Sequence, residues 1–272
     1  MRLGLSSSLK HSSPEEWAEN MVRIGCGSVV FPLDYLQEEQ AIKAYVEAAK
    51  KHELVIAEVG AWCNPISPNK ESSRQAMEYC IGQLKLADRI GAKCCVNVTG
   101  SAGEIWDGAY KENLSDETWK RAVKSIQEII DAANPKHTYY TIESMPWMHP
   151  LGPDEYLKMI EEVDREQFAV HLDIVNWITS PKKYFDNKGF IQECFDKLGS
   201  KVKSCHLKDI KLLGEYTFQL KECKCGEGIL DIETYAQLAD KVSRDMPLII
   251  EHLDTDEAYL SSLEYVKQRL GI

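Results

Sequence analysis

Short apolar runs alternate with longer amphipathic stretches along the whole chain. The apolar runs are rich in Val, Ile and Cys, and they predict strands at residues 3–7, 28–32, 55–60, 93–99, 138–145, 169–175, 202–209 and 248–253. The amphipathic stretches predict helices at 14–24, 38–52, 70–90, 115–133, 153–163, 187–199, 231–244 and 255–269. Each repeating unit takes up about 34 residues, the size of one strand, one helix and two loops.

Residues at the helix ends support this division. Ser13 before Pro14 and Ser115 before an acidic pair are typical N-caps, and Gly91 stands where a left-handed C-cap residue belongs. Strands that alternate with helices indicate a parallel sheet, either open and doubly wound or closed into a barrel. No G-x-G-x-x-G follows the first strand, which disfavours the dinucleotide-binding open sheet. Without a linker or a change in composition, we expect one domain over residues 1–272.

The amino-acid composition of the chain limits the kinds of partner that it is expected to bind. The chain has 32 basic and 43 acidic residues and a net charge of −11, which argues against nucleic-acid or membrane surfaces. It has no long apolar run typical of a membrane span or a signal peptide. The nine cysteines are odd in number and several lie in apolar segments, so we interpret them as reduced thiols of a cytoplasmic protein.

Ionisable residues stand late in each of the last four predicted strands, and they favour the barrel. Active sites of such barrels lie at the C-terminal ends of the strands, where Glu143, Asp173, His206 and Glu251 occur. Alone, each residue is more often a helix cap, a surface ion pair or a core residue. Together in successive strands, they predict a shared divalent cation, since burial of so many charges is costly without one. Oxygen and nitrogen ligands without thiolate suit Mn²⁺, Mg²⁺, Co²⁺ or Zn²⁺.

Further candidates lie beside these four positions. His171 and Lys208 stand two residues from Asp173 and His206, on the same side of their strands. His171 could orient a ligand, touch the substrate or fill a core layer, and Lys208 could bind a substrate oxygen or pair with a carboxylate. Trp62 and Trp147 follow strand ends, where an indole can stack on a sugar or cover the core.

Five segments, TIESMPW, VHLDIVN, SCHLKDI, CGEGILD and IIEHL, carry a resemblance that extends over essentially the whole chain. The chain resembles the sugar isomerase and epimerase superfamily with the xylose-isomerase-like (β/α)₈ TIM barrel. That superfamily includes ketose 3-epimerases, hydroxypyruvate isomerases, inosose dehydratases and, more distantly, endonuclease IV. The resemblance implies one divalent ion, such as manganese, bound by the matching residues Glu143, Asp173, His206 and Glu251.

The resemblance also implies a reaction. In the epimerases and isomerases of this group the two metal-bound glutamates move protons, which assigns that role to Glu143 and Glu251. The metal holds a carbonyl and the neighbouring hydroxyl, one carboxylate removes the α-proton, and the other returns a proton to the enediolate. Return to the same carbon gives an epimer, return to its neighbour gives an isomer, and loss of a β-hydroxyl gives a dehydration.

Two departures limit how far sugar specificity can be carried over. Ketose 3-epimerases usually have His three residues after the metal-binding Asp, where this chain has Asn176, and an Arg after the metal-binding His, where 208–212 has none. We keep Asn176 as a candidate substrate-binding residue. Endonuclease IV uses additional His ligands that are missing from the third and fourth strand ends, so DNA repair is disfavoured.

The expected function is therefore a metal-dependent isomerase or epimerase that acts on a small sugar, keto-sugar or sugar derivative. The alternative is a metal-dependent lyase that dehydrates a keto-inositol or keto-sugar, and a third interpretation is a non-catalytic sugar-binding barrel. The resemblance is also compatible with a homo-oligomer. The expected partner is a small carbohydrate, phosphorylated or not, with no nucleic acid and no membrane.

Overall fold

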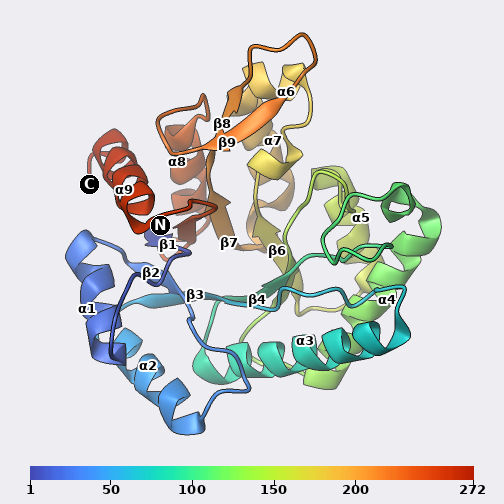
Figure 1. The fold of residues 1–272 in the computed structure, drawn as a ribbon, viewed down its shortest axis with the longest axis horizontal. Coiled ribbons are helices and arrows are strands. Elements are labelled where there is room, and N and C mark those ends of the chain that lie inside the picture. Colours follow the sequence, from blue (N-terminus) through green and yellow to red (C-terminus); the bar gives the residue numbers. More distant parts are fainter.

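A computed structural model describes all residues, 1–272, and shows eight parallel strands surrounded by helices (Figure 1). Neighbouring strands follow the order β1-β10-β7-β6-β5-β4-β3-β2, which confirms the predicted TIM barrel. The strands are β1 (Arg2–Leu5), β2 (Ser28–Val30), β3 (Val55–Gly60), β4 (Cys94–Asn97), β5 (Tyr140–Ile142), β6 (Phe168–Leu172), β7 (Val202–Leu207) and β10 (Pro247–Ile250).

The seam between β1 and β2 closes the barrel. The amide of Gly27 donates to the carbonyl of Leu3 at 2.8 Å, and Ser28 Oγ donates to the carbonyl of Arg2 at 2.8 Å. Gly4 is required here, because a Cβ at this position would lie 2.4 Å from the Ser28 carbonyl oxygen. The absence of a side chain thus lets the first and last strands of the ladder approach each other.

The helices cover the outside of the strands, and their ends agree with the sequence signals (Figure 1). Ser13 and Ser115 accept hydrogen bonds from the amides three residues on, and Gly91 ends its helix with φ 75°. The helices are α1 (Pro14–Ile24), α2 (Glu39–Lys51), α3 (Lys70–Ile90), α4 (Asp116–Ala133), α5 (Pro153–Val163), α6 (Pro181–Phe185), α7 (Asn187–Leu198), α8 (Ile232–Val242) and α9 (Asp256–Leu270). Single 3₁₀ turns lie at Lys111–Leu114, Val175–Trp177 and Gly199–Lys201.

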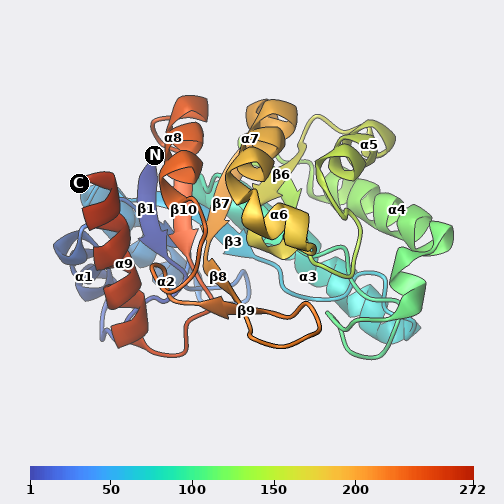
Figure 2. The same ribbon diagram turned by 90° about the horizontal axis from the view of Figure 1, so that it is seen from above.

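A hairpin after β7 was not predicted. Strands β8 (Asp209–Leu212) and β9 (Leu220–Cys223) pair antiparallel and extend beyond the C-terminal ends of the barrel strands (Figure 2). Asp209, predicted as the end of the seventh strand, instead begins the hairpin. Its buried carboxylate accepts hydrogen bonds from the amides of Gly226, Gly228 and Leu230, which fixes the return of the chain toward α8.

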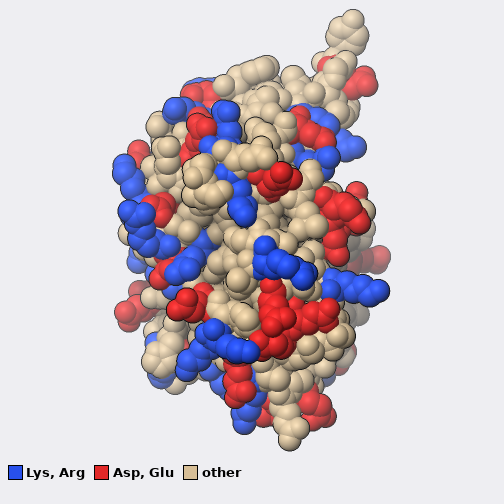
Figure 3. All heavy atoms as spheres, turned by 90° about the vertical axis from the view of Figure 1, so that its left-hand side faces the viewer, with Lys and Arg blue, Asp and Glu red and all other residues tan.

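No helix has the length and apolar character needed to cross a membrane. On the face that carries β1, α1 and α9, basic and acidic side chains alternate, and neither charge forms a continuous patch (Figure 3). All nine cysteines are free thiols, and seven of them are buried, as the sequence predicted for most of them.

Candidate metal centre

The four predicted metal ligands converge at the C-terminal end of the barrel. One ligand atom from each of Glu143, Asp173, His206 and Glu251 lies within 4.8 Å of the other three, and all four residues are buried. Three of them follow the last residue of β5, β6 and β10 directly, and His206 is the penultimate residue of β7. These strands are neighbours in the sheet, so the carboxylates of Glu143 and Glu251 lie at the two flanks of the group.

Backbone and side-chain hydrogen bonds hold the ends of these strands. The amide of Glu143 donates to the carbonyl of Asn97 at 2.8 Å, and Asp173 Oδ1 accepts from the amide of Val175 at 3.1 Å. Tyr235 of α8 donates to the carbonyls of Leu172, at 2.7 Å, and His206, at 3.0 Å. The chain leaves the sheet directly after β5, β6 and β10, earlier than predicted. Glu143, Asp173 and Glu251 stand at these exits, and His206 lies within β7.

Two buried ligand atoms make no hydrogen bond within the protein, namely His206 Nδ1 and Asp173 Oδ2. His206 Nδ1 lies 2.8 Å from Glu251 Oε2 and 3.4 Å from Glu143 Oε1, with unsuitable angles for hydrogen bonds. His206 Nδ1 thus faces two carboxylates without a hydrogen bond of suitable angle, and Asp173 Oδ2 contacts only the Lys208 ammonium; a bound cation would complete the contacts of both atoms. Three carboxylates and an imidazole fit a divalent cation.

Lys208 lies among the same carboxylates. Its Nζ is 2.7 Å from Asp173 Oδ2 and 2.9 Å from Glu251 Oε1, and the residue is only 2% exposed. A buried ammonium is costly unless it is paired, and here it is paired twice. Three ionised carboxylates and one ammonium leave a net charge of −2, which a divalent ion neutralises. The sequence left two roles open for Lys208, a contact with a substrate oxygen and an ion pair with a carboxylate, and these distances correspond to the ion pair.

Glu58 was missed by the sequence reasoning. It lies in β3, is 2% exposed, and accepts hydrogen bonds from Ser204 Oγ at 3.1 Å and from His206 Nε2 at 3.1 Å. Burial acts to raise the pKa of Glu58, but the charges of His206 and His171 outweigh it and lower the pKa. A carboxylate on Nε2 fixes the histidine so that Nδ1 is free for a metal. The available signal was a lone Glu inside an apolar strand.

His171 and Asn176 support the ligands rather than line an open site. His171 is fully buried, and its ring lies edge-on against that of His206 with 4.0 Å between centroids. Burial, and then the charge of His206, lower its pKa to about 4. His171 has no exposed surface in this structure, and its contacts are with His206 and Glu58. Asn176 Nδ2 donates to Glu143 Oε1 at 3.2 Å and to the carbonyl of Ser144 at 2.8 Å, which orients Glu143.

The two candidate tryptophans differ in their contacts. Trp147 is partly exposed, and its Nε1 donates to the carbonyl of Asp107 at 2.8 Å, so it ties together the loops after β4 and β5. Trp62 follows β3, is 41% exposed and lines a cavity. A further histidine lies beside the candidate metal ligands: His252 Nδ1 is 3.2 Å from Lys208 Nζ and 3.1 Å from Glu222 Oε2 of the hairpin.

Uptake of a divalent ion is expected to release about two protons per ion at pH 7. Burial raises the pKa of Asp173 to about 8, against the charge of Lys208. Burial acts to lower the pKa of His206, but Glu251, Glu58 and Glu143 hold it well above its usual value. Both groups are therefore protonated at pH 7 without metal, and both must lose the proton to bind it.

The same protonation also predicts the direction in which metal affinity changes with pH. Metal affinity should fall as the pH falls below about 8, because protons then compete for Asp173 and His206. Calorimetric titration with Mn²⁺ in buffers of different ionisation enthalpy measures the number of protons released. Binding without proton release, or affinity independent of pH between 6 and 8, would contradict it.

The chain belongs to the family described as xylose isomerase-like TIM barrel, whose sequence profile matches residues 18–269. This confirms the resemblance inferred from the five segments. No curated protein sequence matches the chain significantly.

Solved structures of this superfamily are similar in fold. A D-psicose 3-epimerase with D-tagatose, from Clostridium cellulolyticum H10, has a TM-score of 0.72 at 13% identity and covers 100% of this chain and 98% of its own. The probable 3-DHS dehydratase AsbF of Bacillus anthracis has 0.74 at 15%, with 98% of each chain covered. A xylose isomerase-like TIM barrel protein from Mycobacterium smegmatis, in complex with magnesium, has 0.68 at 15%, covering 94% of this chain and 87% of its own. At identities of 13–15%, these similarities show a shared fold.

Proposed function

We propose that this protein is a divalent-metal-dependent isomerase or epimerase of a small sugar, keto-sugar or sugar derivative. The observation that carries the proposal is the convergence of Glu143, Asp173, His206 and Glu251, whose ligand atoms all lie within 4.8 Å of one another. A sugar epimerase among the structural neighbours supports the substrate class, and a neighbour in complex with magnesium supports a metal. We further propose Mn²⁺ or Mg²⁺ as the ion, because three of the four ligands are carboxylates.

The ion, when bound, would polarise a substrate carbonyl and make the neighbouring C–H more acidic. Glu143 and Glu251 would be the proton-transfer groups, since their strands lie at opposite ends of the β5-β6-β7-β10 series. One carboxylate removes a proton from the carbon beside the carbonyl, and the other delivers one. Asn176 orients Glu143 and Lys208 orients Glu251, so each carboxylate keeps one oxygen directed by a neighbouring donor.

A lyase remains the second candidate because one structural neighbour is a probable dehydratase. The same two carboxylates can remove an α-proton and protonate a departing β-hydroxyl. A lyase loses water from its substrate, whereas an isomerase or epimerase leaves the mass unchanged.

The test measures metal and product together. Wild-type protein purified without chelator should contain nearly one divalent ion per chain, and His206→Ala should contain none. Wild type loaded with Mn²⁺ should convert a keto-sugar into a product of equal mass, and EDTA should stop the conversion. A product lighter by one water would favour the lyase. Absence of metal in wild type, even after soaking, would refute both candidates, and His252→Ala serves as the control for loss of a nearby histidine.

A further inference from the structure

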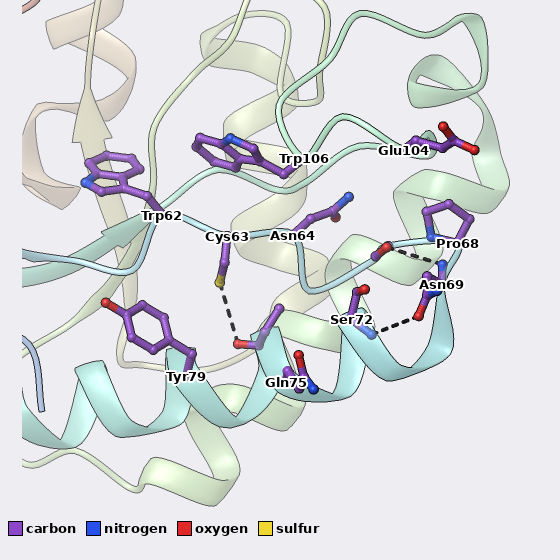
Figure 4. Close-up of a pocket in the computed structure, with 12 residues that line it drawn as sticks. Trp62, Cys63, Asn64, Pro68, Asn69, Ser72, Gln75, Tyr79, Glu104 and Trp106 are labelled. Carbon is purple, nitrogen blue, oxygen red and sulfur yellow. Dashed lines mark hydrogen bonds between the residues drawn. The ribbon is translucent and has the colours of Figure 1, made fainter. Parts of the chain in front are cut away.

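A second cavity opens at the same end of the barrel, between the loop after β3 and the loop after β4 (Figure 4). Its volume is about 930 Å³, which is at the upper end of the range for pockets that enclose a drug-sized ligand. A single small sugar at the metal ligands would leave this space unused. The cavity therefore has room for a part of a larger ligand.

Three aromatic side chains line the cavity. The indoles of Trp62 and Trp106 come from the two loops, and the phenol of Tyr79 projects from α3 below them (Figure 4). Trp62 is 41% exposed and Trp106 is 39% exposed, although large aromatic side chains are usually better buried. Exposed aromatic faces of this kind stack on the C–H face of a sugar ring, and the same rings can turn a polar edge toward its hydroxyls.

Hydrogen-bonding groups in the cavity have no partner in the protein. These groups are Trp62 Nε1, Trp106 Nε1, Tyr79 Oη and Ser72 Oγ. Their surroundings are nevertheless fixed, because Asn64 Nδ2 donates to the carbonyl of Ser101 at 2.8 Å and Asn64 Oδ1 accepts from its amide at 3.1 Å. This pair of bonds joins the two loops that form the walls.

The charged residues in the cavity wall limit the kinds of ligand that the cavity can bind. No lysine or arginine lines the cavity, and Glu104 is its only ionisable acid. A phosphate or carboxylate group would find no cation to bind and would be repelled by Glu104. A neutral polyhydroxy compound suits the combination of aromatic faces, unpartnered donors and absent cations.

One residue, Asn97, contacts both the wall of the cavity and the candidate metal ligand Glu143. The amide of Cys63 in the wall donates to Asn97 Oδ1 at 3.2 Å, and the carbonyl of the same Asn97 accepts from the amide of Glu143 at 2.8 Å. Asn97 therefore holds the cavity wall and Glu143 in a fixed relation to each other.

We infer that the substrate is a neutral glycoside whose reacting sugar lies at the metal ligands and whose second ring occupies the Trp62–Trp106 cavity. This inference rests on the proposed function and names its substrate class. The second ring adds binding energy through stacking and through the unpartnered donors, so a disaccharide should bind more tightly than either of its sugars.

The experiment is a calorimetric titration of the Mn²⁺-loaded protein with glucose, galactose, cellobiose, maltose and lactose. At least one disaccharide should bind about 10-fold or more tightly than its component sugars. Trp106→Ala should remove that advantage and leave the affinity for the monosaccharides unchanged. Ser72→Gln, which fills the cavity from an exposed position of α3, should have the same effect even if Trp106→Ala folds poorly. Tyr216→Ala, an exposed aromatic residue of the hairpin, is the matched control.

The outcomes separate this inference from the proposed function. If no disaccharide binds more tightly than its sugars while Mn²⁺-dependent conversion of a keto-sugar persists, the second-ring site is refuted and the function stands. If His206→Ala retains Trp106-dependent disaccharide binding while wild type shows no metal-dependent turnover, the function is refuted and the sugar site stands. Disaccharide binding that Trp106→Ala and Ser72→Gln leave unchanged would also overturn the inference.

Discussion

Replacement of Glu251 or Glu143 by glutamine is expected to lower kcat by about 10²- to 10⁴-fold, the usual contribution of a positioned acid or base. A glutamine keeps one oxygen to face the metal but cannot accept a proton. At position 143 that oxygen can also turn toward Asn176 Nδ2, which now lies 3.2 Å from Glu143 Oε1. The metal should therefore remain bound while the reaction stops.

The measurement combines metal content with turnover and with exchange of substrate hydrogen in D₂O. Removal of one carboxylate should stop incorporation of deuterium into product while the other carboxylate still allows substrate to bind. Glu222→Gln is the matched control, since Glu222 reaches Lys208 from the hairpin at 3.2 Å without belonging to the metal ligands. Variants with full metal content and wild-type turnover would remove Glu143 and Glu251 from the mechanism.

Lys208→Met is expected to destabilise the metal-free protein by about 3–5 kcal/mol, the cost of breaking a buried ion pair from one side. The ammonium lies 2.7 Å from Asp173 and 2.9 Å from Glu251, so its loss leaves the buried Glu251 carboxylate without this counter-ion. A divalent ion supplies the missing positive charge. The loss of stability should therefore be much smaller when Mn²⁺ is bound, and the ion should bind more tightly than in wild type because no ammonium repels it.

Denaturant unfolding with EDTA and with Mn²⁺ measures this difference. Lys211→Met removes a partly exposed lysine of the same hairpin, paired with Glu227 at 3.3 Å, and should change stability little in either condition. Equal destabilisation of Lys208→Met with and without Mn²⁺ would show that the ion and the ammonium do not share the same carboxylates.

The sequence carried the information for the barrel because the barrel strands are mostly buried and most helices, though not α2, begin with a recognisable cap signal. It also located the buried group of candidate metal ligands, because Glu143 and Glu251 are charged residues at the ends of apolar strands, where burial is costly. The C-terminal ends of seven of the eight barrel strands were placed two or three residues too late, and the end at Gly60 was placed correctly. The turn that begins with Asp173 uses the side chain itself as a hydrogen-bond acceptor, and no hydrophobic period records that.

Features that depend on contacts between distant segments were not predictable in this way. Glu58 meets His206 across 148 positions of the chain, and only the closed barrel brings β3 opposite β7. The hairpin after β7 was read as loop because its strands are mostly exposed and their hydrophobic pattern is weak. The sequence allowed two roles for Lys208, a contact with a substrate oxygen and an ion pair with a carboxylate, because an ammonium suits both. Only the distances in the structure favoured the ion pair.

The hydrogen bonding between neighbouring strands is not uniform around the barrel. Adjacent strands elsewhere share a regular ladder, whereas β1 and β2 are joined across Gly4 by the few hydrogen bonds of the seam. Local opening of the barrel would therefore begin at this seam. The two edge strands, β1 and β2, would be the last to pair during folding. The candidate metal ligands come from β5, β6, β7 and β10, none of which borders the seam, so transient opening of the seam leaves every pairing of these strands intact.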